Sequence, residues 1–536
     1  MNLRNTKYRF IIIWLLPVLI TFFYEFFFTE FNFSRLENFF ENILFAIAML
    51  LTVLWFNSVK IQYILQSIYY VVFLICLFFE TAFYSLFKTQ FSASAIFIAL
   101  ETNIAEAKEF LQFYIDTPII LFFGSLTCCL FLFFRNKSSF FNLILLSKKK
   151  KFLAGGFFIV ILVTLKVTKL IVPNFPYLLF KASYEYYDEQ KKMQAFHIDK
   201  PVGSFVNVEH KTKNKQATYV LIIGESTNKN HLGVYGYYRQ TTPNIEKRRK
   251  DILIYDNVIS SHAYTIGSLK EALTLNNFKK QEEASIIQLM NQAGFKTFWL
   301  SNQRPIGPFE SLVTKISKAS NVYNYTNSAI SGSTTPYDEV LLPYLEKALR
   351  DPAPKKFVVL HILGTHLKYK DRFPEKFKKF TKKPKSKFNS ALALSRRNDY
   401  DNAILYNDYI IEQVIKKVEQ KNESSYVFYF ADHGEEMYEV RDFAGHLDDN
   451  PTKGMFEIPF LLWQSDKFKA ENKLHIDLKR PYVLDDFIHS LADLSQIDFT
   501  GKKNDKSIFS EKFIPKTRII GENLDFDNYD WESNEE

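Results

Sequence analysis

Long runs of apolar residues fill the first third of the chain, and shorter apolar runs alternate with helical patterns in the remainder. Five of the long runs approach the roughly 20 residues that a helix needs to cross the hydrocarbon core of a bilayer. The predicted spans are Phe10–Phe28, Phe39–Phe56, Ile61–Tyr84, Pro118–Phe134 and Phe152–Val172. The pattern predicts a membrane anchor over residues 1–172, followed by a water-soluble region.

The distribution of positive charge predicts the orientation of this anchor. Basic residues precede the first span, and Arg135 and the run Lys148–Lys151 lie between the fourth and fifth spans, whereas the loops after the first and third spans are acidic or mixed. Basic loops stay in the cytoplasm. Five crossings from a cytoplasmic N-terminus would place everything after Pro173 on the opposite side, which is the periplasm for a bacterial inner membrane. No small-residue cleavage site follows the first span, so we interpret it as a retained anchor.

The remainder of the chain predicts two further regions. Residues 173–216 are rich in Tyr, Lys and Pro, which is typical of an interfacial helix and linker. Residues 217–536 alternate strand and helix patterns, which predicts an α/β domain with a central, mostly parallel sheet. The predicted strands are Tyr219–Ile223, Ile252–Val258, Thr297–Leu300, Phe357–Ile362, Ser425–Phe430 and Phe456–Trp463. The predicted helices are Ser268–Leu275, Glu283–Ala293, Pro336–Ala348, Asn402–Val418 and Val483–Leu494.

Composition narrows the possible function classes. The chain has 536 residues, 47% of them hydrophobic, and its 67 basic and 58 acidic residues give a net charge of +9. This excludes a small single fold and a disordered chain. A modest positive net charge is common in membrane proteins, so we do not expect nucleic acid as a partner. Cys76, Cys128 and Cys129 all lie in apolar runs, so the soluble region has neither disulfides nor thiolate metal sites.

Polar residues cluster where predicted strands end. Glu225 follows the first strand, Thr265 follows the second just before a predicted helix, and Asp432 and His433 follow the fifth. In open α/β sheets, ligands bind beyond the carboxyl ends of the strands. Carboxylate oxygens and an imidazole nitrogen suit a catalytic Zn²⁺ with one open position, where a hydroxyl loses its proton more easily. The start of a helix, at Thr265, also favours a bound phosphate.

Each of these residues also has a purely structural explanation. Thr265 and Asp432 could be helix caps, and Glu225 could belong to a turn. His361 lies inside a predicted strand and is expected to be a buried, hydrogen-bonded residue rather than a ligand. The order and the strand-end placement together favour the metal site. His366 and His446 would then hold phosphate oxygens, protonate a leaving group or bind a further metal.

These residues form motifs that resemble the bacterial inner-membrane phosphoethanolamine transferases, which join a five-helix anchor to a periplasmic domain of the sulfatase and alkaline-phosphatase superfamily. The matching stretches include Gly224-Glu-Ser-Thr, His231 through Tyr235-Gly-Tyr, Tyr264-Thr265, Leu360-His through Gly364-Thr-His, Tyr400-Asp-Asn, Ala431-Asp-His-Gly-Glu and Gly445-His. The resemblance implies that one zinc ion is bound by Glu225, Thr265, Asp432 and His433. It makes Thr265 the nucleophile, and places His366 and His446 where they would contact phosphoethanolamine or a second zinc.

The resemblance also implies a reaction and its partners. Phosphoethanolamine would move from phosphatidylethanolamine, through a phospho-threonine intermediate, to the core of lipopolysaccharide or lipooligosaccharide, or to lipid A. Members that modify lipid A typically have a cysteine-rich periplasmic domain and a Pro-Cys-Met stretch after their threonine. Here Thr265 is followed by Ile266-Gly-Ser-Leu. The sequence therefore looks closer to the branch that modifies the lipopolysaccharide core or other acceptors.

Three other functions stay open from the sequence. A phosphoglycerol transferase of the lipoteichoic-acid-synthase type would share the architecture and the threonine, although the stretches at Tyr235 and Tyr400 favour phosphoethanolamine. A membrane-anchored phosphatase or sulfatase-like hydrolase is the second, but sulfatases need a modifiable Cys or Ser followed by Pro and Arg, which is missing after Thr265. A degenerate binding module is the third, and it would require the loss of a nucleophile or ligand.

One strongly basic stretch, residues 376–387, stands apart from these motifs. It contains seven lysines and no acidic residue. Such a charge run is either a solvated, mobile loop or a contact to an anionic glycolipid or membrane surface. The sequence leaves both interpretations open.

Overall fold

The computed structural model of the chain describes residues 3–29, 32–88, 104–136, 147–171, 174–194, 197–212, 216–275, 283–303, 312–327, 335–521 and 523–531. It divides into two compact units. The first comprises residues 1–100 and 114–188, and the second comprises residues 101–113 and 189–536. Val172 and Pro173, where the predicted anchor ends, lie outside the described residues.

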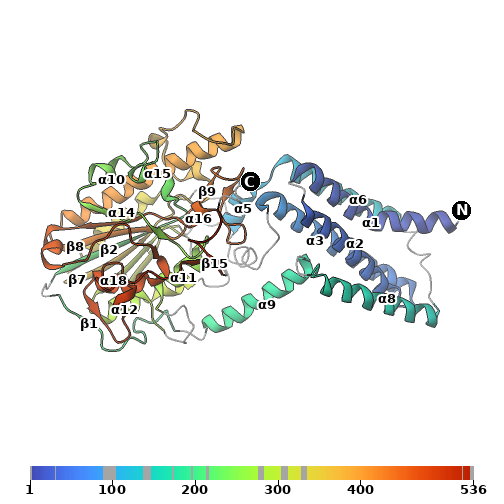
Figure 1. Cartoon of the computed structure of the whole chain (residues 1–536), viewed down its shortest axis with the longest axis horizontal. Coiled ribbons are helices and arrows are strands. Elements are labelled where there is room, and N and C mark those ends of the chain that lie inside the picture. Colours follow the sequence, from blue (N-terminus) through green and yellow to red (C-terminus); the bar gives the residue numbers. More distant parts are fainter. Residues whose placement is uncertain are drawn as a thin grey trace. The chain divides into compact units, whose positions relative to one another are not determined.

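The first unit is built from helices (Figure 1). They are α1 (Leu3–Phe28), α2 (Phe33–Val53), α3 (Val59–Phe87), α6 (Thr117–Arg135), α8 (Lys148–Val167) and most of α9 (Phe175–Gln194). Among the described residues, four helices are long and apolar enough to cross a membrane: α1 from Arg9 onward, α2, α3 and α6. They coincide with the first four predicted spans. Helix α8 covers most of the fifth, but it begins with four lysines and is not among these four helices.

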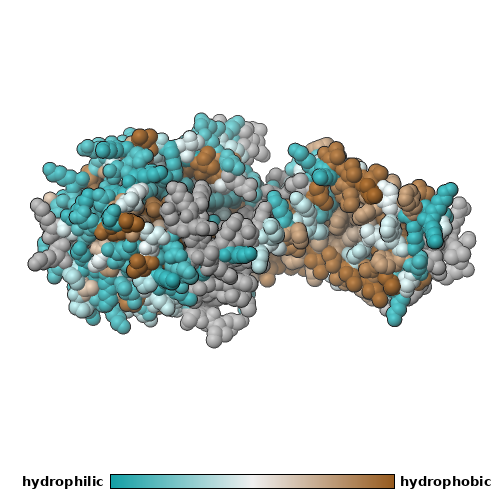
Figure 2. All heavy atoms as spheres, turned by 90° about the horizontal axis from the view of Figure 1, so that it is seen from below, coloured by the Kyte–Doolittle hydropathy of each residue, from teal (hydrophilic) through white to brown (hydrophobic). Residues whose placement is uncertain are grey.

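Polar contacts inside the first unit join its helices, while apolar side chains cover its outside. Arg35 Nη1 lies 3.3 Å from Glu25 Oε1 in a buried ion pair, and Asn38 Nδ2 donates to the same oxygen at 3.3 Å. Phe27 and Leu121 are 70% and 64% exposed. Figure 2 shows apolar residues over much of the visible face of these helices. Such a surface suits contact with lipid acyl chains rather than water.

A sheet of seven described strands organises the second unit, in the order β3-β11-β8-β2-β7-β5-β6. The strands are β2 (Ala217–Gly224), β3 (Ile252–Ile254), β5 (Lys296–Ser301), β6 (Val322–Tyr325), β7 (Lys355–His361), β8 (Ser424–Ala431) and β11 (Phe460–Gln464). Strands β8, β2, β7, β5 and β6 are mutually parallel, and β11 runs antiparallel between β8 and β3. The prediction of a mostly parallel sheet is confirmed.

Helices cover both faces of this sheet (Figure 1). On one side lie α11 (Thr265–Leu273), α12 (Ile286–Gln292) and α18 (Phe487–Leu494), and on the other lie α14 (Leu342–Leu349) and α15 (Ala391–Glu419). Strand β2 shows the consequence, because Tyr219, Leu221 and Ile223 enter the first core while Val220 and Ile222 enter the second. Burial on both faces explains why this strand reads as a continuous apolar run.

The structure also describes five further α-helices and eight further short strands. They are α5 (Ile104–Tyr114), α10 (Pro243–Lys247), α13 (Leu312–Lys318), α16 (Lys453–Phe456), α17 (Asp466–Glu471), β1 (Glu209–His210), β4 (Val258–Ile259), β9 (Glu436–Met437), β10 (Ala444–Gly445), β12 (Tyr482–Val483), β13 (Ile497–Asp498), β14 (Ile519–Ile520) and β15 (Leu524–Asp525). The short antiparallel pair β9–β10 lies next to the candidate site.

Two predicted strands differ from the structure. The run Ile252–Val258 is split, because β3 ends at Ile254 and β4 pairs with β12 in a separate sheet. The run Phe456–Trp463 becomes a strand only from Phe460, after the end of the short helix α16. Pro459 explains this late start, since proline cannot donate a hydrogen bond to a strand ladder.

Candidate active site

Three candidate ligands emerge from two adjacent strands. Strands β2 and β8 are hydrogen-bonded neighbours, with Gly224 opposite Ala431, so Glu225 and Asp432 leave the sheet side by side. The Nε2 atom of His433 lies 3.4 Å from Glu225 Oε1 and 3.5 Å from Asp432 Oδ2. All three side chains are buried, and one ligand atom of each lies within 4.8 Å of the others. The structure therefore brings together the three candidate residues that follow the first and fifth predicted strands.

Two atoms of this cluster are buried without a hydrogen bond among the described residues: Asp432 Oδ2 and His433 Nε2. The other atom of each group is satisfied. Asp432 Oδ1 accepts from the backbone N–H groups of Ser226 at 3.1 Å and His433 at 2.8 Å, and His433 Nδ1 lies 2.8 Å from the carbonyl oxygen of Gly434. Nδ1 therefore donates to that carbonyl oxygen, and Nε2 is the ring atom that faces the two carboxylates. Buried polar atoms without partners are rare, and two that face each other indicate a cation site.

Thr265 completes the cluster from a different segment. It is the first residue of α11, and its hydroxyl donates to both oxygens of Glu225 at 3.3 Å. No side chain caps this helix, so its first N–H groups are available to an anion. The hydroxyl of Ser268, one turn further along, donates to the carbonyl oxygen of Asp432 and holds α11 against the end of β8. The structure thus places Thr265 beside the three buried ligands.

His366 and His446 lie at the edge of this cluster. His446 follows β10, and its ring centroid is 4.2 Å from that of His433. Its Nδ1 lies 2.9 Å from Glu435 Oε2, and the Tyr369 hydroxyl donates to the other oxygen of Glu435 at 2.7 Å. His433, Glu435 and His446 form a second group with closely spaced ligand atoms. His366 lines a small pocket, and its Nδ1 has no hydrogen bond among the described residues.

The electrostatics of the cluster favour bound positive charge. Burial lowers the pKa of His433, but the carboxylates of Asp432 and Glu225 outweigh this and raise it to about 10. Burial raises the pKa of Asp432 to about 6, and the nearby Glu225 acts in the same direction. Burial also lowers the pKa of His366 to about 4 and that of His446 to about 3. Both outer imidazoles are therefore neutral near pH 7 and present lone pairs.

Further residues that sequence reasoning did not single out hold Glu225 in place. Thr365 donates from its hydroxyl to the carbonyl oxygens of Glu225 and Ser226, at 2.8 Å each. Asp338 is buried and accepts from the backbone N–H groups of Leu363 at 2.8 Å and Gly364 at 2.9 Å. Thr365 lies inside a motif that the sequence did show. Asp338 had no such signal, because it lies within a predicted helix.

Two contacts close the site on its remaining side. Gln303 Nε2 donates to Glu225 Oε2 and to the carbonyl oxygen of Ile362, at 3.1 Å each. Gln303 also lines the small pocket that contains His366, so it connects that histidine to the carboxylate cluster. Gly364 adopts φ +53°, and a Cβ there would lie 3.0 Å from both the nitrogen and the oxygen of Glu225. Only glycine allows this close approach.

The expectation for His361 is wrong in one respect. The residue is buried, as predicted, at the end of β7. However, its Nε2 has no hydrogen bond within the part of the chain that the structure describes. Its ring instead packs edge-on against Trp299, with centroids 5.9 Å apart. The described contact of the His361 ring is therefore packing against Trp299 rather than a hydrogen bond from Nε2.

A buried network of charged side chains lies next to the candidate site. His231 is fully buried, with Nδ1 2.8 Å from Asp401 Oδ1 and Nε2 3.1 Å from Glu439 Oε1. Arg239 Nη1 lies 2.7 Å from the other oxygen of Asp401. Tyr400 donates to the carbonyl oxygen of Ser226 at 2.7 Å, next to the candidate ligand Glu225. The stretches around His231 and Tyr400 are therefore scaffold, not ligands.

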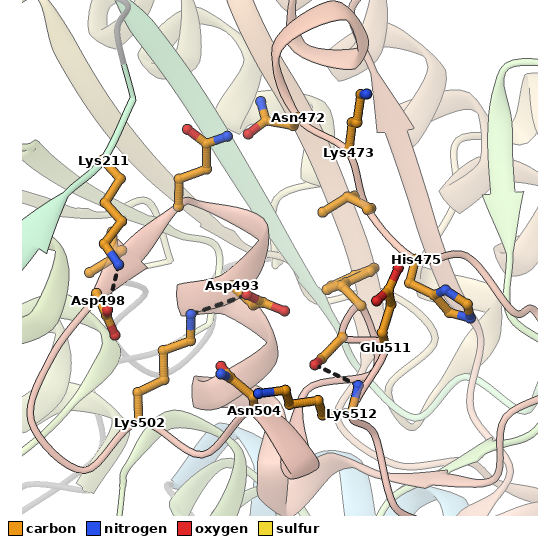
Figure 3. Close-up of a pocket in the computed structure, with 15 residues that line it drawn as sticks. Lys211, Asn472, Lys473, His475, Asp493, Asp498, Lys502, Asn504, Glu511 and Lys512 are labelled. Carbon is orange, nitrogen blue, oxygen red and sulfur yellow. Dashed lines mark hydrogen bonds and ion pairs between the residues drawn. The ribbon is translucent and has the colours of Figure 1, made fainter.

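A separate pocket of about 640 Å³ contains none of the candidate site residues (Figure 3). Its lining includes β13, the end of α18 and the segment after α17. Two ion pairs cross it: Lys211 with Asp498 at 2.6 Å, and Lys502 with Asp493 at 3.1 Å. With its charges largely paired and no cluster of nucleophile and ligands, it is not the reactive centre.

The chain is similar to known proteins over most of its length. Residues 217–497 match the sulfatase family model. The phosphoethanolamine transferase EptC of Escherichia coli (strain K12) is 32% identical over 468 residues, which cover 82% of this chain and 81% of the relative. The chain belongs to the phosphoethanolamine transferases of the sulfatase family. It is therefore an enzyme of the transferase class.

Two solved structures extend this likeness. The C-terminal periplasmic domain of EptC from Escherichia coli, in complex with Zn, is 35% identical to this transferase with a TM-score of 0.59, and the match covers 62% of this chain and 98% of the domain. The integral membrane transferase EptA from Neisseria meningitidis is 19% identical with a TM-score of 0.67, over 93% of this chain and 98% of EptA. The second comparison shows the same fold across the membrane helices and the α/β unit.

Proposed function

We propose that this transferase moves phosphoethanolamine from phosphatidylethanolamine to a lipopolysaccharide or lipooligosaccharide acceptor, with Thr265 as the nucleophile. The observation that carries the proposal is the position of the Thr265 hydroxyl. Thr265 is the first residue of α11, and its hydroxyl lies 3.3 Å from both oxygens of Glu225. The same carboxylate lies 3.4 Å from Nε2 of His433. A nucleophile, an anion-binding helix start and a cation site thus meet at one point.

The donor atoms fit one zinc ion. Glu225 and Asp432 would supply carboxylate oxygens, His433 its Nε2 and Thr265 its hydroxyl oxygen, which is the oxygen and nitrogen set that zinc accepts. The unpartnered Asp432 Oδ2 and His433 Nε2 support this assignment, as does the zinc complex of the Escherichia coli relative. Bound there, zinc would supply positive charge that lowers the pKa of the threonine hydroxyl. A second ion would fit beside Glu435 and His446.

In the first step, Thr265 Oγ1 forms a bond to the phosphorus of phosphatidylethanolamine. The Thr265 hydroxyl gives up its proton, the bond from phosphorus to the diacylglycerol oxygen breaks, and that oxygen takes up a proton in turn as diacylglycerol leaves. The free N–H groups at the start of α11 stabilise the phosphoryl oxygens. The neutral imidazoles of His366 and His446 contact the phosphoethanolamine group. The product is phosphoethanolamine attached covalently to Thr265.

In the second step, a hydroxyl or phosphate of the acceptor attacks the same phosphorus. The bond to Thr265 breaks, and the proton from the acceptor returns to the threonine oxygen. Splitting one transfer into two displacements lowers the barrier of each. The acceptor is proposed to be the lipopolysaccharide core rather than lipid A, because the second unit contains no cysteine and Thr265 is not followed by a Pro-Cys-Met stretch.

The membrane helices set where this reaction takes place. We propose that residues 1–172 form five spans with a cytoplasmic N-terminus, that residues 173–216 form an interfacial helix and linker, and that residues 217–536 form the catalytic domain in the periplasm. The four apolar helices and the basic start of α8 support this topology. Anchoring in the bacterial inner membrane restricts the enzyme to the surface that contains its lipid donor, which raises the effective donor concentration.

Replacing Thr265 by Ala tests the proposal. Purified full-length variant should retain zinc through Glu225, Asp432 and His433 but form no covalent intermediate, and transfer should fall at least a thousandfold. Thr265→Ser is the matched control, since it keeps a hydroxyl and should retain measurable transfer. Full activity of the alanine variant contradicts the assignment.

Mass spectrometry of the trapped intermediate separates the alternatives. A phosphoethanolamine adduct on Thr265 supports the proposal, whereas a phosphoglycerol adduct indicates a phosphoglycerol transferase. Release of free phosphoethanolamine with no labelled acceptor indicates a hydrolase. Glycolipid masses from a deletion strain and its complemented parent then identify the acceptor, and an unchanged core would exclude the lipopolysaccharide core.

A further inference from the structure

The basic segment, residues 376–387, has a fixed backbone rather than the mobile loop that its charge allows. Asn402 is buried on α15, and its Oδ1 accepts from the backbone N–H groups of Lys379 and Phe380, at 2.8 Å each. Its Nδ2 donates to the carbonyl oxygen of Phe380 at 3.1 Å. Arg239 adds a hydrogen bond of 3.0 Å to the carbonyl oxygen of Lys382. The first half of the segment is therefore tied to the body of the unit.

The second half is held in the same way. The backbone N–H of Lys385 donates to the Tyr238 hydroxyl at 2.9 Å, and Pro384 is buried. The hydroxyl of Ser386 donates to the carbonyl oxygen of Tyr438 at 3.4 Å. Hydrogen bonds thus hold both halves of the basic segment, and they fix the backbone positions from which its side chains extend.

All seven lysines of the basic segment are exposed, and two of them, Lys376 and Lys385, place their ammonium groups over the rings of Tyr409 and Tyr238. The seven lysines are Lys376, Lys378, Lys379, Lys382, Lys383, Lys385 and Lys387. Two have an acidic neighbour: Lys376 lies 3.9 Å from Glu339, and Lys378 lies 3.2 Å from Glu375. The other five make no ion pair with any described residue. Holding like charges close together on an ordered backbone is unfavourable until an anion neutralises them.

The basic segment is connected to the strands that present His446. Ser386 contacts Tyr438, which directly follows β9. Strand β9 pairs with β10, and His446 comes immediately after β10. Arg239, which holds the segment at Lys382, is also bonded to Asp401 in the network behind the site. The basic segment is therefore linked, through Tyr438 and the β9–β10 pair, to the stretch that carries His446.

We propose that the basic segment binds phosphate groups of the acceptor glycolipid and so positions the acceptor for the second displacement, an inference that rests on the proposed function. Lysine ammonium groups are point charges that bind phosphate from many directions. Attraction to a membrane in general needs only mobile lysines, whereas a fixed backbone tied to the body of the unit places the charges at defined positions. This favours a phosphorylated glycan over the lipid surface.

The test uses the full chain in nanodiscs of phosphatidylethanolamine. The variant K379Q/K382Q/K383Q/K385Q removes four unpaired charges of the basic segment. The control K473Q/K479Q/K503Q/K512Q removes four exposed lysines elsewhere, two of which line the pocket in Figure 3. The probe is core oligosaccharide released from lipopolysaccharide, used as purified and after treatment with a phosphatase. Transfer to each form is measured across a range of salt concentrations.

We expect the KM for the phosphorylated probe to rise at least tenfold in the basic-segment variant at low salt, because four charges that would neutralise its phosphate groups are removed. The KM for the dephosphorylated probe, kcat, and the rate at which Thr265 is labelled by the donor should stay unchanged. The control variant should match the unmodified enzyme. An unchanged KM for the phosphorylated probe in the basic-segment variant would overturn the proposal.

Two further outcomes separate the possible sources of failure. If the variant instead loses donor labelling of Thr265 in a way that depends on added phosphatidylglycerol in the disc, the partner is the membrane surface and the proposal is wrong. If the unmodified enzyme forms no intermediate at all, the proposed function fails. In that case, direct binding of the phosphorylated probe still tests the segment, and equal binding by the enzyme and the variant would overturn it.

Discussion

Replacing His231 by Gln should remove a pH-dependent part of the stability of the α/β unit. Burial alone lowers the pKa of this imidazole, but the carboxylates of Glu439 and Asp401, 3.1 and 2.8 Å away, outweigh burial and raise it from 6.5 to about 9. The folded pKa therefore exceeds the unfolded value. The stabilisation is complete below about pH 6.5 and is lost as the pH rises through about 9.

The size of the effect follows from these two pKa values. The rise from 6.5 to about 9 corresponds to roughly 3 kcal/mol, because each pKa unit is worth about 1.4 kcal/mol. The assay is urea or thermal unfolding of the full chain at pH 6, 7.5 and 9.5. The gap in unfolding free energy between the enzyme and His231→Gln should be largest at pH 6 and shrink by about that amount at pH 9.5.

A histidine on the surface provides the control. His475 is exposed, so His475→Gln should leave the unfolding free energy unchanged at every pH. A gap between the enzyme and His231→Gln that stays constant from pH 6 to pH 9.5 would refute the reasoning. It would show that His231 contributes by packing rather than by its charge.

Two further predictions concern the site itself. Gly364→Ala should destabilise the unit by more than the roughly 1–2 kcal/mol cost of a left-handed backbone, and lower transfer at least tenfold, because its Cβ would meet the backbone of Glu225 at 3.0 Å. Gly236→Ala is the control, because Gly236 has φ +98° but a Cβ there would meet no atom within 4 Å. Its thermal unfolding should show only the loss of stability from the left-handed backbone, and it should retain transfer. Asp432→Asn should lose zinc in metal analysis of the purified chain, whereas Asp493→Asn should retain it; equal zinc content would contradict the ligand assignment.

The sequence predicted the centre of the fold better than its edges. Strands β2, β7 and β8 were found to within two residues at each end, because burial on both faces gives long apolar runs. Strand β6 was missed, since it lies at the sheet edge and its residues are only partly buried or exposed. Edge strands are short and half-solvated, so their pattern is weak.

A similar division holds within the candidate site. Glu225, Thr265 and Asp432 were recognisable because they follow strands or start a helix, and chain order alone then brings them to one edge of the sheet. Gln303 and Asp338 were given no role, because they act by donating to or accepting from other segments. Such roles depend on tertiary contacts that no local pattern encodes. The missing partner of His361 Nε2 could not be foreseen for the same reason.

Three of the proposed ligands directly follow β2 and β8, and this placement has a consequence for metal loss. These strands are adjacent at the middle of the sheet, and every residue of both is buried. Zinc fingers unfold when the metal is removed, because the ion holds them together. Here the surrounding core maintains the geometry without the ion, so stripped enzyme should keep slow amide hydrogen exchange along both strands and regain activity when zinc is restored. In a cell with too little zinc, the enzyme would then stay folded but inactive rather than unfold and be degraded.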